Sequence, residues 1–528
     1  MRRYTWIVLL SLPVFAAIQI NKNETKAAET RPNILFCIAD DASYRHMSAY
    51  GLSGKWISTP GFDRVAAGGI LFENAFTPNA KCSPSRACIL TGRNPWQLEE
   101  AANHVPFFPA KFSTWVEELG NSGYLTGFTG KGWAPGNPGQ KNGATRLLTG
   151  KHYNEKKMAA PTKAISPVNY AANLEVFLKD RKAGQPFCFW YGGHEPHRAY
   201  EYGSGAAKGK KKITDIDRVP AYWPDNDTVR NDMLDYAYEI EYFDQHLQQM
   251  LKILEDAGEL NNTIVIVTSD NGMPFPRTKG HVYDYDNHLP LAIMWKNGIK
   301  TAGRKVLDLV SFIDFAPTLL EAAGLTGKTS VETQGRSLIP IFKSDKAGLV
   351  DKTRDHVLLG KERTDVGRPH DAGYPVRGIV KGNLIYTINY KPERWPSGNP
   401  ETGYLDTDGG PTKTQILNAK RAGTDVEKWD LSFGKKGKEE LYDIGNDIDA
   451  MKNLATDPEY AKTKAALRKQ MEQELKAQQD PRMSGKGDIF DSYPFAEPAS
   501  RNFYERFMKG EKMKAGWVNE SDFEKEKK

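Results

Sequence analysis

Three long apolar runs constrain the fold of this chain more than any other feature of its sequence. They are residues 33–41 (NILFCIADD), 186–197 (PFCFWYGGHEPH) and 263–272 (TIVIVTSDNG). Continuous runs of β-branched and aromatic residues are typical of parallel strands that are covered on both faces of a sheet. Helical patterns separate the runs, for example at residues 227–257, so we expect an α/β fold in which crossover helices connect parallel strands.

The sequence pattern changes after about residue 351. Short strands with hairpin signals, such as Lys381-Gly382-Asn383, indicate a smaller antiparallel domain. The last twenty residues mix Lys and Glu densely, which is typical of a frayed tail. We therefore divide the chain into a signal segment (1–28), a larger domain (29–345), a smaller C-terminal domain (346–490) and a C-terminal extension (491–528).

The N-terminus predicts export. Arg2 and Arg3 precede an apolar run at residues 6–18, and the small residues Ala16 and Ala17 close it. This pattern is typical of a secretory signal peptide, and an uncleaved signal anchor is less favoured because the run is too short to span a bilayer comfortably. We expect the export machinery to deliver the protein to the periplasm or the extracellular space.

Charge and cysteine content exclude several classes of protein. The chain has 72 Lys and Arg against 66 Asp and Glu, a net charge of +6, which is too balanced for a nucleic-acid-binding protein. Beyond the N-terminus no apolar run is long enough for a membrane span, so we expect a soluble body with no stable membrane partner. Of the four cysteines, Cys37 and Cys188 lie within apolar runs and are predicted to be buried thiols, whereas Cys82 has polar neighbours.

Oxygen-bearing side chains follow two of the predicted strands. Asp40 and Asp41 end the first run, and Asp270 and Asn271 end the third. Because the carboxyl ends of parallel strands meet at one edge of a sheet, these four side chains should lie together. Three carboxylates and one amide oxygen suit a hard cation such as Ca²⁺ or Mg²⁺, although acidic residues also commonly cap strands and helices.

The segment CSPSRACILTG places Cys82 at the start of a helix, because Pro84 suits the first helical turn. Unpaired backbone N–H groups at that position favour anions, and Arg86 adds positive charge one turn further on. An isolated cysteine is more often a buried core thiol, but the carboxylates and cations predicted nearby favour a functional role for this one.

Further cations and imidazoles follow predicted strands. Lys131 lies in TGKGWAPG, His194 and His197 lie in GGHEPHR, and DNGMPFPRTKGH contains Arg277 and Lys279. Each side chain could bind an anion or transfer a proton, and each alone could equally be an ordinary loop residue. His194 is the best of these candidates because it directly follows a buried strand.

CSPSRACILTG resembles the maturation and active-site motif of the formylglycine-dependent sulfatases, a family within the alkaline-phosphatase superfamily. The resemblance extends through RPNILFCIADD, TGKG, GGHEPHR, SDNG and ELYDIGNDIDAMKNLA, and so covers most of the chain after the signal. It implies a large mixed, mostly parallel sheet flanked by helices in the larger, catalytic domain. It also implies a smaller C-terminal α+β domain built on an antiparallel sheet.

The resemblance implies a mechanism as well. A formylglycine-generating enzyme would oxidise Cys82 to formylglycine (3-oxoalanine), whose hydrated aldehyde attacks sulfur and later expels sulfate. Arg86 would position the formylglycine, and Lys131 and Lys279 would clamp sulfate oxygens. His194 would contact the sulfate or protonate the leaving atom. One Ca²⁺ ion, or Mg²⁺ in its place, would be held by Asp40, Asp41, Asp270, Asn271 and an oxygen of the modified Cys82.

One position departs from the family. Many sulfatases carry a His two residues after the Lys that matches Lys131, and this chain has Trp133 there. His104 or His152, from other loops, could support the formylglycine instead, or turnover could be altered.

The segments HEPHRAYEYG, VPAYWPDN and ELNNTIVIVTSDNGMPFP resemble the heparan N-sulfatase (N-sulfoglucosamine sulfohydrolase) branch of the family and its bacterial relatives. The implied substrate is a sulfated saccharide, such as a glycosaminoglycan fragment, and its sulfate could be on nitrogen or on oxygen. Candidate sugar-binding residues are His197, Glu362, Arg363, His370 and Arg377. Those in the smaller domain could equally be surface charges or domain-interface residues.

Two other functions stay open at this point. A phosphoester or phosphonate hydrolase of the same superfamily would share the fold, but such relatives usually have Thr or Ser in place of Cys82 and a second metal. A catalytically silent protein that binds sulfated glycans would be consistent with Trp133. The presence of Cys82, Lys131 and His194 argues against it.

Overall fold

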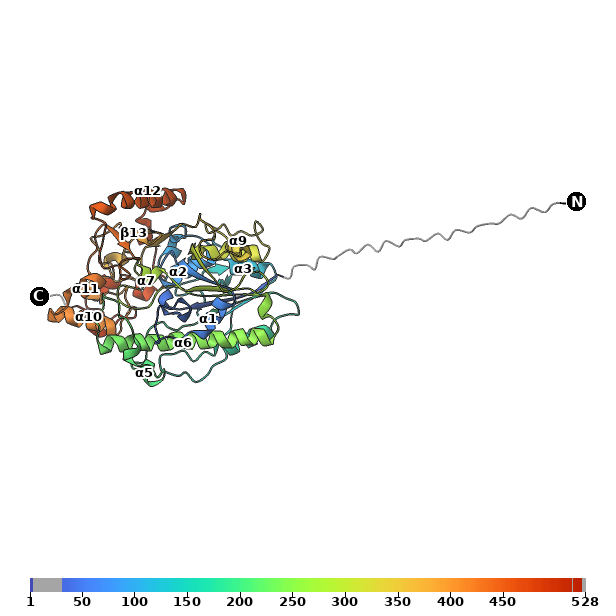
Figure 1. The fold of residues 1–528 in the computed structure, drawn as a ribbon. Coiled ribbons are helices and arrows are strands. Elements are labelled where there is room, and N and C mark those ends of the chain that lie inside the picture. Colours follow the sequence, from blue (N-terminus) through green and yellow to red (C-terminus); the bar gives the residue numbers. More distant parts are fainter. Residues whose placement is uncertain (3–30, 515, 525–528) are drawn as a thin grey trace.

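The computed structural model describes residues 1–2, 31–514 and 516–524. The predicted signal peptide therefore lies almost entirely outside the described residues. The larger domain contains an eight-stranded sheet in the order β10-β2-β9-β8-β1-β7-β3-β6 (Figure 1). Its strands are β1 (Asn33–Ala39), β2 (Ile70–Phe76), β3 (Leu125–Gly130), β6 (Lys151–His152), β7 (Phe187–Gly192), β8 (Thr263–Ser269), β9 (Leu291–Met294) and β10 (Arg304–Ser311).

The sheet is mixed and mostly parallel, which confirms the prediction. Within the described residues, β9 is the one strand of this sheet that runs antiparallel to its neighbours, β2 and β8. The strand β1 pairs in parallel with β7 on one side and with β8 on the other. The three long apolar runs of the sequence are therefore adjacent strands, and their carboxyl ends meet at one edge.

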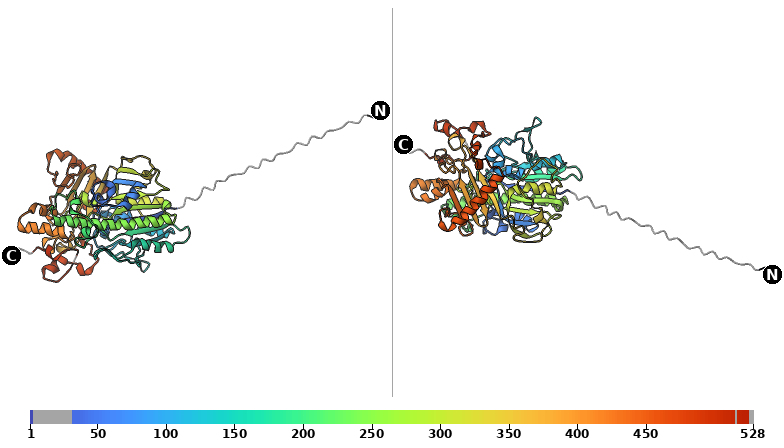
Figure 2. Two further views of the ribbon diagram at one scale, coloured as in Figure 1. Left: turned by 60° about the horizontal axis from the view of Figure 1, so that its bottom comes forward. Right: turned by 90° about the horizontal axis from the view of Figure 1, so that it is seen from above.

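Helices cover both faces of this sheet (Figures 1 and 2). In Figure 1 the long helix α6 runs below the sheet, whereas α2, α3 and α9 lie above it. A short hairpin, β4 (Gln140–Lys141) and β5 (Ala144–Thr145), stands apart from the sheet. The helices are α1 (Pro60–Ala67), α2 (Cys82–Thr91), α3 (Trp115–Asn121), α4 (Tyr170–Lys179), α5 (Ser204–Ala207), α6 (Asp227–Asp256), α7 (Asp284–Asn287), α8 (Phe315–Ala322) and α9 (Ile339–Lys343).

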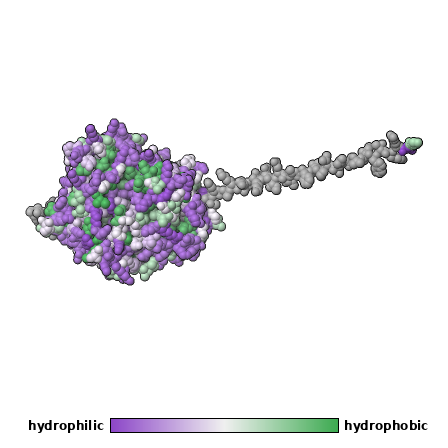
Figure 3. All heavy atoms as spheres, in the orientation of Figure 1, coloured by the Kyte–Doolittle hydropathy of each residue, from purple (hydrophilic) through white to green (hydrophobic). Residues whose placement is uncertain are grey.

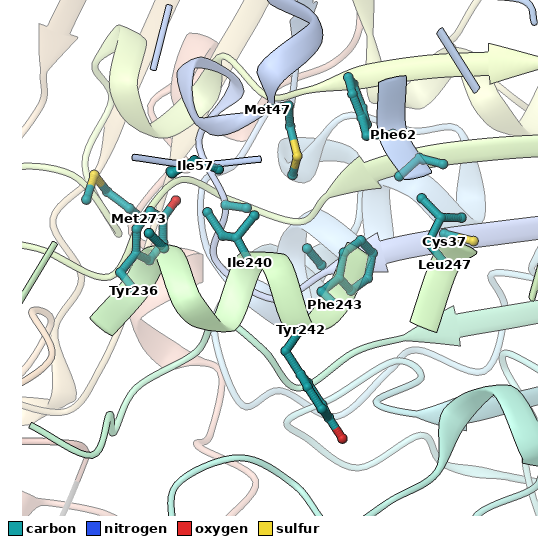
Figure 4. Close-up of a cluster of buried hydrophobic side chains, with 14 of the residues drawn as sticks. Cys37, Met47, Ile57, Phe62, Tyr236, Ile240, Tyr242, Phe243, Leu247 and Met273 are labelled. Carbon is teal, nitrogen blue, oxygen red and sulfur yellow. The ribbon is translucent and has the colours of Figure 1, made fainter. Parts of the chain in front are cut away.

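The alternation of side chains along β1 divides the core into two layers. Cys37 points to the face that α6 covers, and Figure 4 shows it in the same cluster as Phe243 of that helix. Phe36 points to the opposite face, where its ring stacks on Trp190 with 4.5 Å between the ring centroids. Cys37 and Cys188 are buried free thiols, as predicted.

The smaller domain is built on an antiparallel four-stranded sheet, also as predicted. Its strands, in spatial order, are β11 (His356–Lys361), β12 (Val376–Lys381), β13 (Leu384–Asn389) and β14 (Glu439–Asp443). Helix α12 crosses this sheet, as the view from above in Figure 2 shows, and Leu467 and Met471 of α12 pack into the core beneath it. The remaining helices are α10 (Pro411–Ala422), α11 (Val426–Phe433), α12 (Ala461–Ala477), α13 (Ile489–Ser492) and α14 (Phe503–Met508).

The described part of the C-terminal extension is not the frayed tail that we expected. Asp522 is fully buried and forms an ion pair with Lys413 of α10, with 3.3 Å between Oδ2 and Nζ. Phe523 stacks on Phe507 of α14 with 5.1 Å between the ring centroids. The dense Lys and Glu pattern was misleading because the apolar residues between the charges dock this segment onto the protein.

No helix among the described residues is both long and apolar enough to cross a membrane. The face of the molecule in Figure 3 is mostly hydrophilic, with hydrophobic residues scattered across it. Single exposed hydrophobic side chains of this kind are common on folded proteins.

Phe36→Ala should destabilise the protein by about 3–5 kcal/mol, because it removes a buried ring that packs against Trp115, Trp190 and Phe315 and leaves a cavity. Urea unfolding followed by tryptophan fluorescence measures the change. Leu307→Ala is the control, since Leu307 is half exposed on β10, and it should stay within about 0.5 kcal/mol of the wild type. Equal unfolding midpoints for the two variants would contradict this packing.

Candidate active site

A cavity of about 650 Å³ opens at the carboxyl edge of the large sheet. We call it the Cys82 cavity. Its walls come from the larger domain, from loops of the smaller domain and from the C-terminal extension. The sequence-predicted residues that line it are Asp40, Cys82, His104, Lys131, His194, His197 and Lys279.

Two strand ends supply a cluster of buried oxygen atoms. Asp40 and Asp41 follow β1, Asp270 and Asn271 follow β8, and all four are at most 2% exposed. The backbone N–H of Asp41 donates to Asp270 Oδ1 at 3.1 Å, and Asn271 Nδ2 donates to Asp41 Oδ1 at 2.7 Å. One potential ligand atom each from Asp40, Asp270 and Cys82 lies within 4.8 Å of the other two. The structure therefore brings these side chains together beside Cys82.

Each carboxylate of this cluster is paired with at least one cation. Burial alone would lower the pKa of Lys131 and of Lys279, but the carboxylates beside them outweigh burial and raise the pKa of both. Both lysines are therefore charged at neutral pH. The shortest pair of each carboxylate, with the distance between the charged atoms, is Lys131–Asp40 (2.7 Å), Lys279–Asp41 (2.7 Å) and Arg86–Asp270 (2.8 Å).

The cluster fits a hard divalent cation. Its strand-end donors are all oxygen atoms, and Oδ1 of Asn271 is buried without a hydrogen-bond partner in the described part of the chain. Burial, and next the charge of Asp40, raise the pKa of Asp270. A Ca²⁺ or Mg²⁺ ion bound there would favour the ionised form of this carboxylate.

Cys82 is the first residue of α2, and its Sγ lies 3.6 Å from Asp40 Oδ1. Burial raises the pKa of the thiol to about 12, so an unmodified Cys82 is protonated and a weak nucleophile at neutral pH. Arg86, one turn along α2, donates to the backbone carbonyls of Lys131 and Gly132, both at 2.8 Å. Arg86 therefore holds the loop that carries Lys131 against the helix that carries Cys82.

Two glycines let the loop after β3 approach the end of β7. The backbone N–H of Lys131 donates to the Gly192 carbonyl at 2.7 Å. A Cβ at Gly192 would lie 1.8 Å from the Lys131 carbonyl oxygen, and a Cβ at Gly130 would lie 1.9 Å from the Gly192 carbonyl oxygen. This close approach of the two backbones places Lys131 beside Asp40.

Trp133, at the position where many sulfatases carry a His, has a packing role. Its Nε1 donates to the Ser83 carbonyl at 3.1 Å, and its ring contacts Phe108 edge-on. His104 lines the Cys82 cavity, and both of its ring nitrogens are buried without a hydrogen-bond partner in the described structure. His152 is exposed on β6, stacks on a phenylalanine ring and does not line the cavity.

The loop after β7 supplies a further wall of the cavity. The His194 side chain is exposed there, and its backbone N–H donates to the Tyr170 hydroxyl at 3.2 Å. His197 Nε2 lies 3.9 Å from Asp41 Oδ2. Arg277 was predicted as a further cation of the site, but it does not line the cavity. Its guanidinium donates instead to backbone carbonyls of the smaller domain.

The four candidate sugar-binding residues of the smaller domain do not line the Cys82 cavity. Glu362 and Arg377 form a buried ion pair at 2.8 Å, and Arg377 also pairs with Asp480 at 2.7 Å. Arg363 is buried and donates to a backbone carbonyl of the C-terminal extension, whereas His370 is 89% exposed beside Glu505. These positions favour an interface or surface role over the contact with a sugar that we predicted.

Several residues of the cavity were missed by sequence reasoning. Asp408 lies 2.8 Å from Lys279 Nζ, and Lys81, Asp365 and Trp517 also line the cavity. The sequence feature that could have identified Asp408 is the acidic, glycine-rich turn DTDGGP at residues 406–411. Trp517 could have been suspected because it is a large aromatic residue in a strongly charged segment.

Comparison with known proteins identifies the family of this chain. A profile of the sulfatase family matches residues 32–325, which is more than half of the chain. Over 484 residues the chain is 28% identical to the N-sulphoglucosamine sulphohydrolase of Homo sapiens, covering 83% of this chain and 89% of that protein. Over 491 residues it is 27% identical to an ulvan-active sulfatase of Formosa agariphila, covering 85% of this chain and 75% of that protein.

The fold is similar to that of a protein whose structure was solved in complex with its substrate, D-glucosamine-2-N,6-O-disulfate. The TM-score is 0.61 at 21% sequence identity, over 85% of this chain and 98% of that one. At this identity the likeness concerns the fold alone. The match to the family over residues 32–325 confirms the resemblance inferred from CSPSRACILTG, and the chain belongs to the sulfatase family of hydrolases.

Proposed function

We propose that this chain is an exported sulfatase that removes sulfate from a sulfated sugar, using a formylglycine formed from Cys82 and a bound Ca²⁺ ion. The observation that carries the proposal is the Cys82 cavity, where a buried cysteine at a helix N-terminus adjoins three carboxylates, an amide oxygen and two charged lysines. Maturation by a formylglycine-generating enzyme follows from the motif CSPSR. Delivery to the periplasm or the extracellular space follows from the predicted signal peptide.

The metal and the formylglycine would supply a Lewis acid for a sulfate oxygen and a nucleophilic oxygen for sulfur. The side chains that fit the metal are Asp40, Asp41, Asp270 and Asn271. Arg86 fixes the position of residue 82 indirectly, because it joins the helix that carries this residue to Asp270 and to the loop after β3.

Lys131 and Lys279 would bind the sulfate group. Both are charged, and both are held in place by carboxylates before any substrate binds, so little reorganisation is needed when charge develops on the sulfate oxygens. His194 has its side chain exposed in the cavity, where it would hold or move a proton at the leaving atom.

A sulfated saccharide is the substrate class that the cavity and the relatives support. Lys81, Lys131 and Lys279 suit a sulfate, and Asp365 and Asp408 offer acceptors for sugar hydroxyl groups. Relatives carry names such as N-sulphoglucosamine sulphohydrolase, N-acetylglucosamine-6-O-sulfatase and ulvan-active sulfatase. These names favour a sulfated sugar over the phosphoester that was the main alternative.

His104 is the histidine that we propose to support the formylglycine in place of the His that this chain lacks at Trp133. Two observations support His104 over His152: it lines the Cys82 cavity, and its two buried ring nitrogens are free to accept or donate a hydrogen bond there. Unpaired buried polar atoms cost free energy, so their presence beside a reactive residue points to function rather than stability.

The first test is the chemical state of Cys82. Trypsin cuts after Lys81 and Arg86, and mass spectrometry of the peptide CSPSR from natively exported protein should show an aldehyde in place of the thiol. Cys82→Ala should abolish sulfate release with little change in thermal stability, whereas Cys88→Ala, a buried thiol on the same helix, should keep the activity. An intact thiol in a protein that binds sulfated sugars without cleaving them would restore the glycan-binding alternative.

The second test is metal-dependent stability. Ca²⁺ at a hundred times its Kd should stabilise the wild type by about 2.7 kcal/mol, because it binds only the folded state, and a chelator should reverse this. Asp270→Asn should lose the effect, whereas Asp345→Asn, at an exposed carboxylate, should keep it. Thermal unfolding with and without Ca²⁺ is the measurement. An unchanged melting temperature of the wild type would refute the metal site.

The third test separates the two histidines. His104→Leu should lower kcat by roughly 10²-fold and leave the melting temperature equal or higher, because it removes two unpaired buried polar atoms. His152→Leu should change neither quantity, since His152 lies outside the cavity. Sulfate release under saturating substrate gives kcat. Equal kcat values for the two variants would rule out this role for His104.

A further inference from the structure

A tryptophan of the C-terminal extension forms part of the wall of the Cys82 cavity. Trp517 and Cys82 line the same cavity, although more than 400 residues separate them in the chain. Its ring contacts His197 at 69°, with 5.4 Å between the centroids. The side chain is 58% exposed, so most of this large apolar ring faces solvent rather than a core. A ring of this kind at a cavity has apolar area to offer to a ligand.

The segment that carries Trp517 is firmly attached. Asp522 and Lys413 are both fully buried and pair at 3.3 Å. The backbone N–H of Gly409 donates to the Trp517 carbonyl. A Cβ at Gly409 would lie 2.8 Å from the Asn519 nitrogen and 3.0 Å from the Trp517 carbonyl oxygen, so only glycine allows the two backbones to approach this closely. The backbone that carries the ring is thus held in place before a ligand arrives, which lowers the entropy lost on binding.

The Cys82 cavity has two chemically different regions, one around Cys82 and one around Trp517. Cations and the oxygen cluster lie around Cys82, where a sulfate would bind. Asp365 and Asp408, from loops of the smaller domain, add hydrogen-bond acceptors. An aromatic face together with hydroxyl acceptors is the combination that suits a pyranose ring, which has apolar C–H faces and polar hydroxyl edges.

We propose that Trp517 is the surface on which the sugar ring of the substrate stacks, so that the C-terminal extension determines which saccharide the enzyme accepts. This inference rests on the proposed function and extends it from the sulfate to the sugar. Trp517 recognises the sugar and leaves the chemistry at sulfur to the residues around Cys82.

The experiment compares two readouts in Trp517→Ala. A panel of N- and O-sulfated monosaccharides is screened with the wild type, and the one cleaved fastest is used throughout. Its kcat/KM should fall about tenfold or more in Trp517→Ala, mainly through KM, because the stacking surface is gone. Inhibition by inorganic sulfate, which has no sugar ring, should stay within twofold of the wild type.

Two further variants make the comparison specific. Trp517→Phe keeps an aromatic face and should retain most of the kcat/KM. Tyr202→Ala removes an aromatic side chain that is similarly exposed, at 61%, and does not line the cavity, so it should behave as the wild type. Unchanged kcat/KM in Trp517→Ala, or an equal loss of inhibition by inorganic sulfate, would overturn the proposal.

Failure of the proposed function gives a different result. If the wild type releases no sulfate from any sugar of the panel, the sulfatase activity proposed above fails. Calorimetry with the same sugars then tests Trp517 alone. The proposal that Trp517 stacks on the sugar is supported if a sugar binds the wild type and binds Trp517→Ala at least tenfold more weakly. Every other outcome refutes it.

Discussion

Three buried ion pairs at one edge of the large sheet decide the arrangement of everything around them. A buried charge without a partner costs several kcal/mol, so neither the carboxylates nor the cations could be placed there alone. The pairs join the ends of β1 and β8 to helix α2 and to the loops after β3 and β8. The interactions that hold the fold together at this edge therefore also gather the residues of the site. The three ion pairs are Asp40–Lys131, Asp41–Lys279 and Asp270–Arg86.

The part of the site that lies on the sheet could be predicted from the sequence. Strands buried on both faces leave continuous apolar runs, and the residues that follow such runs must emerge at one edge. That rule places Asp40, Asp270 and His194 near one another without any knowledge of the loops. Pro84 likewise predicts the helix start that puts Cys82 beside them.

The rest of the site could not be predicted in this way, because it comes from loops that no periodic pattern positions. Asp408 and Trp517 reach the cavity only through the docking of the smaller domain and the extension. Glu362, just after β11, and Arg377, on β12, were equally open to contact with a sugar and to a place at the domain interface. The structure pairs the two side chains with each other inside the protein.

The origin of the cavity walls has a consequence for how the protein can diversify. The charged floor is built from the larger domain, where Gly130 and Gly192 leave no room for even one added carbon atom. The rim at Asp365 and Trp517 comes from a loop of the smaller domain and from the extension, and neither residue takes part in the three ion pairs. Mutations in the rim can therefore accumulate and redirect the enzyme toward new saccharides while the reaction itself is inherited unchanged.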